Sequence, residues 1–145
     1  MTGWLIDTNV ISELRKPRPE ERVVSFVSRQ PLDSLFISTV TFAEIRFGIE
    51  KLNDPARRAQ IAAWLENEMR PLFEGRILPL SEDILLKWRL IFEQGRKQGH
   101  TFSHPDVLIA ATATHHGLTV VSRDTRDFIA AGVRVLNPWT DEFPA

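Results

Sequence analysis

Short apolar runs alternate with longer amphipathic segments along the whole chain. The runs occupy residues 4–6, 35–38, 118–121 and 133–136, and a weaker one occupies 76–80. Their short length and β-branched content are typical of strands that are buried on both faces of a parallel sheet. The pattern therefore predicts an α/β fold whose central parallel sheet has about four to five strands.

The segments between these runs carry apolar residues at helical spacing. One such pattern extends over residues 61–73, and a second extends over 84–92 after the N-terminal signal at 81–83. Residues 15–19 and 94–102 are rich in proline, glycine and basic side chains, which predicts two loops. Helices that flank the sheet and connect its strands by right-handed crossovers complete the expected architecture.

The composition indicates one globular domain that spans residues 1–145. Hydrophobic residues make up 43% and charged residues 26% of the chain, and we find no linker, repeat or low-complexity segment. Cysteine is absent, which excludes disulfides, thiol catalysis and cysteine-ligated zinc. Because no run approaches the roughly 18 apolar residues of a membrane span and no leader pattern is seen, we expect a cytoplasmic protein without membrane contact.

The charge balance gives little indication of a partner. The net charge of −1 provides no overall attraction to nucleic acid. Arginine nevertheless outnumbers lysine fourteen to four, and its planar fork suits bidentate contacts to phosphate. A bias in genomic base composition is an equally good explanation of this excess.

Four carboxylates stand where chain geometry can gather them. Asp7 and Asp124 each follow an apolar run, Glu44 lies one turn into the helix expected after residues 35–38, and Asp106 opens another helix. In open α/β sheets the carboxyl ends of the strands form the edge at which ligands bind. We therefore expect the four acids to lie together at that edge.

Each acid also has a simpler explanation as part of a helix start. Thr41 and Glu44 have the spacing of a capping box, as do Ser103 and Asp106. The same rigid first turn would hold a carboxylate still for a second purpose, so the two explanations are compatible.

The other two acids have comparable local explanations. Asp7 precedes Thr8 and Asn9, either of which could cap the helix that follows. Asp124 could cap the short helix that contains Asp127. The four acids are unusual together, since they share one edge of one expected sheet.

Such a cluster predicts a site for a hard divalent cation. Unneutralised carboxylates repel one another, and Mg²⁺ or Mn²⁺ prefers oxygen ligands. A bound cation makes water more acidic and offsets the charge that develops on a reacting phosphoryl group. Phosphodiester hydrolysis is the chemistry that best matches an all-carboxylate site.

The chain resembles the PIN-domain ribonucleases, in particular the VapC-type toxins and their FitB-like branch. The resemblance covers nearly the full length, and the spacings between successive acids, of 37, 62 and 18 residues, fit the family. Its motifs lie at residues 5–13, 37–48, 106–113, 117–124 and 135–139.

The resemblance implies a role for each matching position. The acidic quartet of Asp7, Glu44, Asp106 and Asp124 would surround Mg²⁺ or Mn²⁺ and carry the catalysis. Thr8 and Asn9 would shape the turn that presents the first acid, and Ser38 and Thr41 would support the second through hydroxyl hydrogen bonds. Many relatives carry asparagine at the position of Asp124, and Asp127 is its rival for the fourth place.

The remaining polar residues give weaker indications. Arg46 and Arg123 are candidates for contact with a substrate phosphate, and Arg15, Lys16, Arg18, Arg96 and Lys97 for a basic rim. His100 and His104 are spaced as a metal pair, but Pro105 and the loop composition argue against zinc. Trp64, Trp88 and Phe92 are expected to pack in the core or at a dimer interface.

We therefore interpret the sequence as a metal-dependent endoribonuclease toxin of a type II toxin–antitoxin system. The resemblance further implies a homodimer, an antitoxin of the VapB or FitA kind that obstructs the acidic groove, and operator DNA bound only through that antitoxin. One alternative is a catalytically silent protein of the same fold. A weaker alternative is an aspartate-based phosphotransfer module, which would need a lysine at a strand end that this chain lacks.

Overall fold

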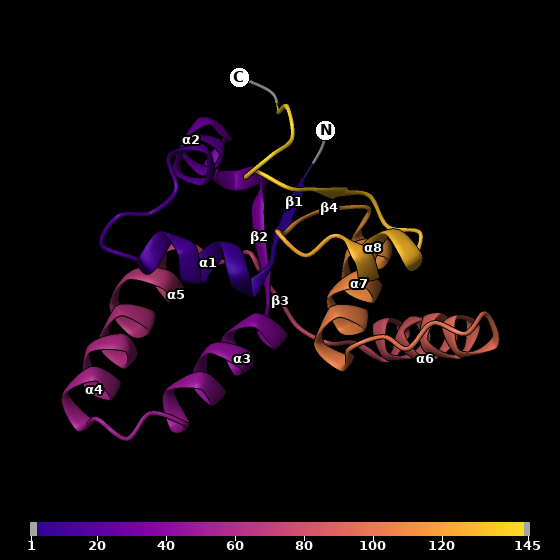
Figure 1. The fold of residues 1–145 in the computed structure, drawn as a ribbon, viewed down its shortest axis with the longest axis horizontal. Helices are drawn as coiled ribbons and strands as arrows, with labels where there is room; N and C mark the ends of the chain where they lie inside the picture. The colour runs from indigo at the N-terminus through magenta and orange to yellow at the C-terminus, as the bar shows by residue number, and fades with distance from the viewer. Residues whose placement is uncertain (1–2, 144–145) are drawn as a thin grey trace.

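Five parallel strands form the central sheet of the computed structural model, which describes residues 3–143 (Figure 1). Their spatial order is β3-β2-β1-β4-β5. The strands are β1 Trp4–Ile6, β2 Leu35–Ser38, β3 Ile77–Leu78, β4 Thr119–Val121 and β5 Val135–Leu136. This sheet confirms the predicted α/β class and includes a strand in each of the five apolar runs.

The chain builds the sheet outward from β1 in two directions. Trp4 is in register with Leu35 of β2 on one side and with Thr119 of β4 on the other. The strand order reverses at β1, because β2 and β3 extend one way and β4 and β5 extend the other. Ligands of open parallel sheets bind at such a reversal, outside the carboxyl ends of the strands.

The helices cover both faces of this sheet. In Figure 1, α1, α2, α4 and α5 lie to one side of the strands, α6, α7 and α8 lie to the other, and α3 lies below. No helix of residues 3–143 is long and apolar enough to cross a membrane. The helices are α1 Thr8–Arg15, α2 Glu21–Arg29, η1 Leu32–Ser34, α3 Thr39–Glu50, α4 Pro55–Trp64, η2 Leu65–Met69, α5 Arg70–Leu72, α6 Glu82–Lys97, α7 His104–His116 and α8 Arg126–Ala130.

One predicted loop begins later than the sequence indicated. The segment 94–102 was expected to be a loop throughout, but Gln94–Lys97 forms the last turn of α6. Gly95 is accepted in this helix because Phe102 packs directly against its backbone, where a Cβ atom would lie 2.8 Å from Phe102 Cδ2. A tertiary contact therefore outweighs the poor helix propensity of glycine.

The alternation of side chains along each strand divides the core into two clusters. Trp4 and Ile6 pack with α1, α2 and η2, whereas Leu5 between them packs with α7 and α8. Val121 and Val120 of β4 divide in the same way. Both faces of the central strands are therefore buried, which explains why these strands are continuous apolar runs.

Candidate active site

Asp7 is held rigidly at the junction between β1 and α1. It is the residue that caps α1, accepting a hydrogen bond at Oδ1 from Thr8 N (2.8 Å). Its other oxygen, Oδ2, accepts a hydrogen bond from Ser122 Oγ (2.7 Å). The side chain is only 5% exposed, so both oxygens need these partners.

Asn9 ties this junction to the end of β4. Its Nδ2 donates to Ser122 Oγ (3.0 Å), and its Oδ1 accepts from Arg123 N (3.2 Å). The amide therefore locks the hydroxyl that contacts Asp7. Asn9 was expected to shape the turn or to cap the helix; the cap is Asp7 itself, and Asn9 acts across the sheet edge instead.

Glu44 lies on α3, whose start differs from the predicted capping box. The cap is Ser38, whose Oγ accepts a hydrogen bond from Val40 N (3.0 Å). Thr41 already lies inside the helix, fully buried, and its Oγ1 has no hydrogen-bond partner. The predicted support of Glu44 by the two hydroxyls is therefore wrong, because one faces the helix start and the other faces the core.

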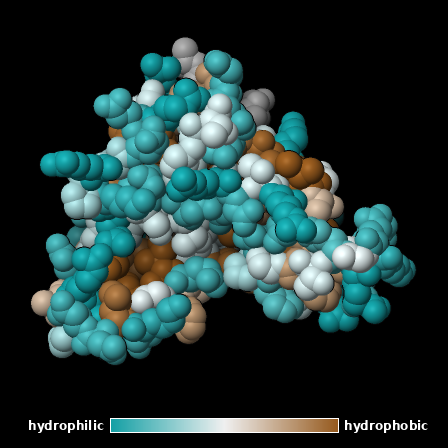
Figure 2. Space-filling view, in the orientation of Figure 1, coloured by the Kyte–Doolittle hydropathy of each residue, from teal (hydrophilic) through white to brown (hydrophobic). Residues whose placement is uncertain are grey.

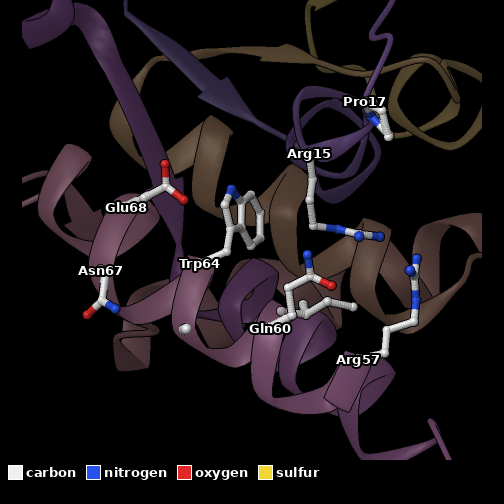
Figure 3. Close-up of a pocket in the computed structure, with 9 residues that line it drawn as sticks. Arg15, Pro17, Arg57, Gln60, Trp64, Asn67 and Glu68 are labelled. Atoms are coloured by element: carbon white, nitrogen blue, oxygen red, sulfur yellow. The ribbon is translucent and has the colours of Figure 1, made fainter. Parts of the chain in front are cut away.

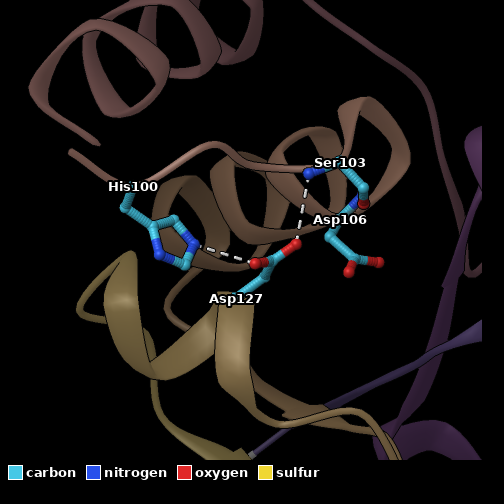
Figure 4. Close-up of polar contacts among 4 residues, drawn as sticks. All are labelled: His100, Ser103, Asp106 and Asp127. Carbon is cyan, nitrogen blue, oxygen red and sulfur yellow. Dashed lines mark hydrogen bonds and ion pairs between the residues drawn. The ribbon is translucent and has the colours of Figure 1, made fainter. Parts of the chain in front are cut away.

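Asp106 lies in the first turn of α7, where half of the predicted capping box forms. Ser103 Oγ accepts from Asp106 N (3.3 Å), as the pattern predicts. The reciprocal bond comes from elsewhere, because Ser103 N donates to Asp127 Oδ2 (3.2 Å) rather than to Asp106. Figure 4 shows the carboxylate of Asp106 directed away from Ser103 N. Asp127 thus takes over the capping bond from Ser103 N, and the Asp106 carboxyl group is hydrogen-bonded to Asp127 instead.

Asp124 and Asp127 have distinct surroundings. The Asp124 carboxylate is exposed, and its backbone N donates to Ser122 Oγ (3.1 Å). Asp127 is paired with His100, at 2.9 Å between Nε2 and Oδ1 (Figure 4). Asp124 does not cap α8, since the residue before that helix is Thr125.

The four predicted acids line one open cavity of about 630 Å³. They reach it from the end of β1, from α3, from the start of α7 and from the loop after β4. The expectation that they share one edge of the sheet is therefore met. The cavity is lined by Asp7, Thr8, Asn9, Ser12, Glu13, Lys16, Glu44, Ser103, Pro105, Asp106, Arg123, Asp124, Asp127 and Trp139.

Two carboxyl groups of this cavity, those of Asp7 and Asp106, have raised pKa values. Burial is the main cause that raises the pKa of Asp7, and the charges of Asp124 and Glu44 raise it further. Burial, followed by the charge of Asp7, raises the pKa of Asp106 to about 7. Burial acts to raise the pKa of Asp127, but the hydrogen bond from His100 outweighs it together with the other contacts and holds the pKa below its usual value.

The donor set fits a hard divalent cation. All four acids offer oxygen ligands, and a cation would offset both the burial and the mutual repulsion that raise the pKa values of Asp7 and Asp106. Among residues 3–143, no three or more histidine or acidic side chains lie in a group that could hold a metal ion as the side chains are placed. Mg²⁺ retains several of its waters when it binds to proteins. An open acidic cavity therefore suits a partly hydrated Mg²⁺ better than an ion that must lose all of its waters.

The predicted basic contacts are only partly placed at this cavity. Arg123 lines it and lies over the ring of Trp139, with its Cζ 5.1 Å from the ring centroid. Arg46 instead lines a small separate cavity with residues of α4 and η2. Two positions along a helix turn a side chain by about 200°, so Arg46 points away from the face that carries Glu44.

Other candidates also take separate places. Lys16 lines the acidic cavity and pairs with Glu13 (2.9 Å), whereas Arg96 pairs with Glu93 (3.0 Å) on α6. His104 stacks on Phe92 with ring centroids 5.4 Å apart. His100, which is paired with Asp127, and His104 therefore have different partners.

Sequence reasoning missed two residues that shape the cavity. Ser122 belongs to a motif but was given no role, although a serine directly after a buried strand and beside another strand's terminal acid was a usable signal. Trp139 lines the cavity from beyond β5 and supports Arg123. Its position depends on the path of the chain after the last strand, which no local pattern predicts.

Comparison with known proteins agrees with this geometry. The family model of the PIN domain matches residues 4–133, which is most of the chain. The protein belongs to the PIN domain family.

Several PIN-domain relatives are similar over almost their whole length. The chain is 42% identical over 137 residues to Toxin FitB of Neisseria gonorrhoeae, covering 94% of this chain and 99% of the relative. It is 38% identical over 135 residues to VapC ribonuclease Y4jK of Sinorhizobium fredii, covering 93% and 96%. The solved structure of FitAB bound to the IR36 DNA fragment matches with a TM-score of 0.88 and 39% identity, covering 97% of this chain and 98% of that one.

Proposed function

We propose that the protein is an endoribonuclease toxin of a type II toxin–antitoxin pair, which hydrolyses RNA phosphodiester bonds with Mg²⁺ or Mn²⁺. The observation that carries the proposal is the acidic cavity, in which carboxylates from four separate elements converge beside the strand-order reversal. The ribonuclease and toxin names of relatives with 38% and 42% identity support the same activity. We treat residues 1–145 as one PIN domain, of which the family match covers 4–133.

Asp7, Glu44, Asp106 and Asp124 would hold the cation, which supplies an acidified water and neutralises charge on the phosphoryl oxygens when bound. The chain's own contribution is positioning. Ser122 and Thr8 fix the two oxygens of Asp7, and the capping bond taken by Asp127 leaves the Asp106 carboxylate facing the cavity.

Arg123 is the candidate for the substrate phosphate. It lines the acidic cavity beside Asp124, and its stacking on Trp139 restricts its guanidinium group. A preorganised arginine loses less conformational entropy when it binds an anion. Arg46 is not proposed as a phosphate contact, because it lines a different cavity.

The partners in this proposal follow from the relatives. FitAB is a two-component assembly on DNA, so we propose that a VapB- or FitA-like antitoxin binds this chain and that operator DNA is bound through it. We also propose that the protein is a homodimer and that it acts in the cytoplasm.

The test is cleavage of purified cellular tRNA and structured RNA by the isolated protein in Mg²⁺, in Mn²⁺ and in EDTA. The variants Asp7→Asn and Asp106→Asn control for a contaminating nuclease, because each keeps the shape of the side chain and removes its charge. Metal-dependent cuts that both variants lose would support the proposal. Cleavage that survives in both variants, or that EDTA does not stop, would contradict it.

A further inference from the structure

A second cavity of about 580 Å³ lies next to the acidic one, between the end of α1 and the helix α4. Arg15 reaches into it from α1, and Arg57, Gln60 and Trp64 reach into it from α4 (Figure 3). None of these side chains takes part in the hydrogen bonds that position the acids of the first cavity. Their grouping therefore needs a separate explanation.

The second cavity is continuous with the acidic cavity. A smaller hollow of about 220 Å³ shares Thr8, Ser12 and Glu44 with the acidic cavity. At its other end the hollow shares Arg15, Arg57, Ile61 and Trp64 with the second cavity. Figure 2 shows it as an apolar depression below α1, between α3 and α4. A trench therefore leads from the carboxylates to Trp64.

The far end of this trench carries two positive charges without a carboxylate partner. Among the described residues, no ion pair involves Arg15 or Arg57, whereas the neighbouring Arg58 pairs with Glu50 (3.2 Å). The guanidinium groups of Arg15 and Arg57 approach the same space (Figure 3). Two like charges that face one cavity favour the binding of an anion. The acid Glu68 lines the opposite side of Trp64 in this view.

Trp64 provides a fixed aromatic surface in the same cavity. One part of the ring packs against the core cluster, so the side chain is half-buried, and the remainder lines the cavity. The amide of Gln60, one turn earlier on α4, offers a donor and an acceptor beside it. An aromatic platform, an amide and paired arginines are the groups that bind an unstacked nucleotide.

We propose that this cavity is a nucleotide subsite for single-stranded RNA. A nucleotide that flanks the cleaved bond stacks its base on Trp64, and Arg15 and Arg57 bind its phosphate. The inference rests on the proposed function, because the RNA strand enters the trench from the acidic cavity. It assigns substrate binding to four residues that lie outside the acidic site.

The test compares substrates of different length. A dinucleotide supplies only the cleaved bond, whereas oligonucleotides extended on either side can reach the second cavity. The measured quantity is the gain in kcat/KM on extension. Trp64→Leu and the double variant Arg15→Gln/Arg57→Gln should each reduce this gain about ten-fold, mainly through KM. Trp64→Phe should retain most of it, because it preserves a ring.

Arg58→Gln is the matched control, since Arg58 is the next residue on α4 and is paired outside the trench. It should keep the full gain. Melting temperatures of all variants show whether a loss reflects unfolding, and Arg57 is exposed, so its substitution should not affect folding. An unchanged gain in the Trp64 and arginine variants would overturn the inference while leaving the proposed nuclease intact.

A direct readout does not depend on cleavage. RNA that carries 4-thiouridine should crosslink, in Asp106→Asn protein, to the peptide that contains Gln60 and Trp64. Crosslinks confined to other surfaces would overturn the subsite. The subsite would also be overturned if Trp64→Leu weakened only the binding of a protein partner, because the cavity would then be a protein docking site.

Discussion

Ser122 Oγ donates a 2.7 Å hydrogen bond to Asp7 Oδ2, and this contact joins the ends of the two neighbouring strands β1 and β4. Both residues are buried, and Asn9 Nδ2 donates to the same hydroxyl. The orientation of the most buried acid of the site is therefore set by a residue that lies 115 positions away.

Replacement of this serine by alanine should weaken the site more than the fold. Ser122→Ala removes a donor to Asp7 and leaves the amide of Asn9 without its acceptor, so we expect Mn²⁺ affinity to fall about ten- to a hundred-fold. Isothermal titration with Mn²⁺ measures this change. Ser34→Ala is the matched control, because Ser34 is a buried serine bonded to Pro31 O at the other end of β2. Equal Mn²⁺ affinities in the two variants would show that the Ser122 contact has no role in the site.

The strand ends explain why much of this site could be predicted. Asp7 and Asp124 follow apolar runs, and parallel strands bring such positions to one edge whatever the loops do. The position of Asp106 could be predicted from its local helix-start pattern. For these acids, the local sequence predicts the strand or helix that carries each residue. The topology of the sheet then predicts the edge at which its side chain lies.

The remaining contacts depend on tertiary structure. Ser103 N could have donated to the Asp106 carboxylate, but the carboxylate of Asp127, which comes from another helix, accepts that bond. Thr41 has the spacing of a cap yet lies inside α3, because the helix already begins at Thr39. Arg46 is close to Glu44 in sequence and on another side of the helix. Spacing alone does not show which of two competing partners a backbone group selects.

The raised pKa of Asp106 predicts a pH-dependent destabilisation of the metal-free protein. The pKa rises from 3.8 to about 7 on folding, so the folded state retains a proton that the unfolded chain releases. Stability should therefore fall as the pH rises from about 4 to 7. Asp106→Asn removes this effect and should raise the stability in EDTA at pH 8 by about 1–2 kcal/mol after solvent screening, or roughly 3–6 °C in Tm.

Differential scanning fluorimetry at pH 4 and pH 8 checks the sign. The gain of Asp106→Asn over the wild type should be small at pH 4 and larger at pH 8, and Mg²⁺ should raise Tm in the wild type more than in the variant. Asp33→Asn, at an exposed acid before β2, controls for the general loss of a negative charge. A gain that is independent of pH would mean that Asp106 ionises freely.

Asp124 and Asp127 should separate in their effects. Asp124 is exposed in the acidic cavity, so Asp124→Asn should lower Mn²⁺ affinity and RNA cleavage about ten-fold or more, with little change in Tm. Asp127→Asn breaks the ion pair with His100 and weakens the bond from Ser103 N, so it should cost about 1 kcal/mol of stability. Paired Tm and Mn²⁺-titration measurements distinguish them, and the reverse assignment would make Asp127 the fourth ligand.

The unpaired hydroxyl of Thr41 leads to a stabilising substitution. Its Oγ1 is buried without a partner, and valine keeps the β-branched shape while it removes the polar atom. Thr41→Val should therefore raise the free energy of unfolding by about 1 kcal/mol in urea denaturation. Thr112→Val is the control, because that buried hydroxyl donates to Leu108 O (2.8 Å) and its loss brings no such gain. If Thr41→Val instead abolishes RNA cleavage at unchanged stability, the hydroxyl must turn toward Glu44 in the active protein, and the buried orientation seen here is not the catalytic one.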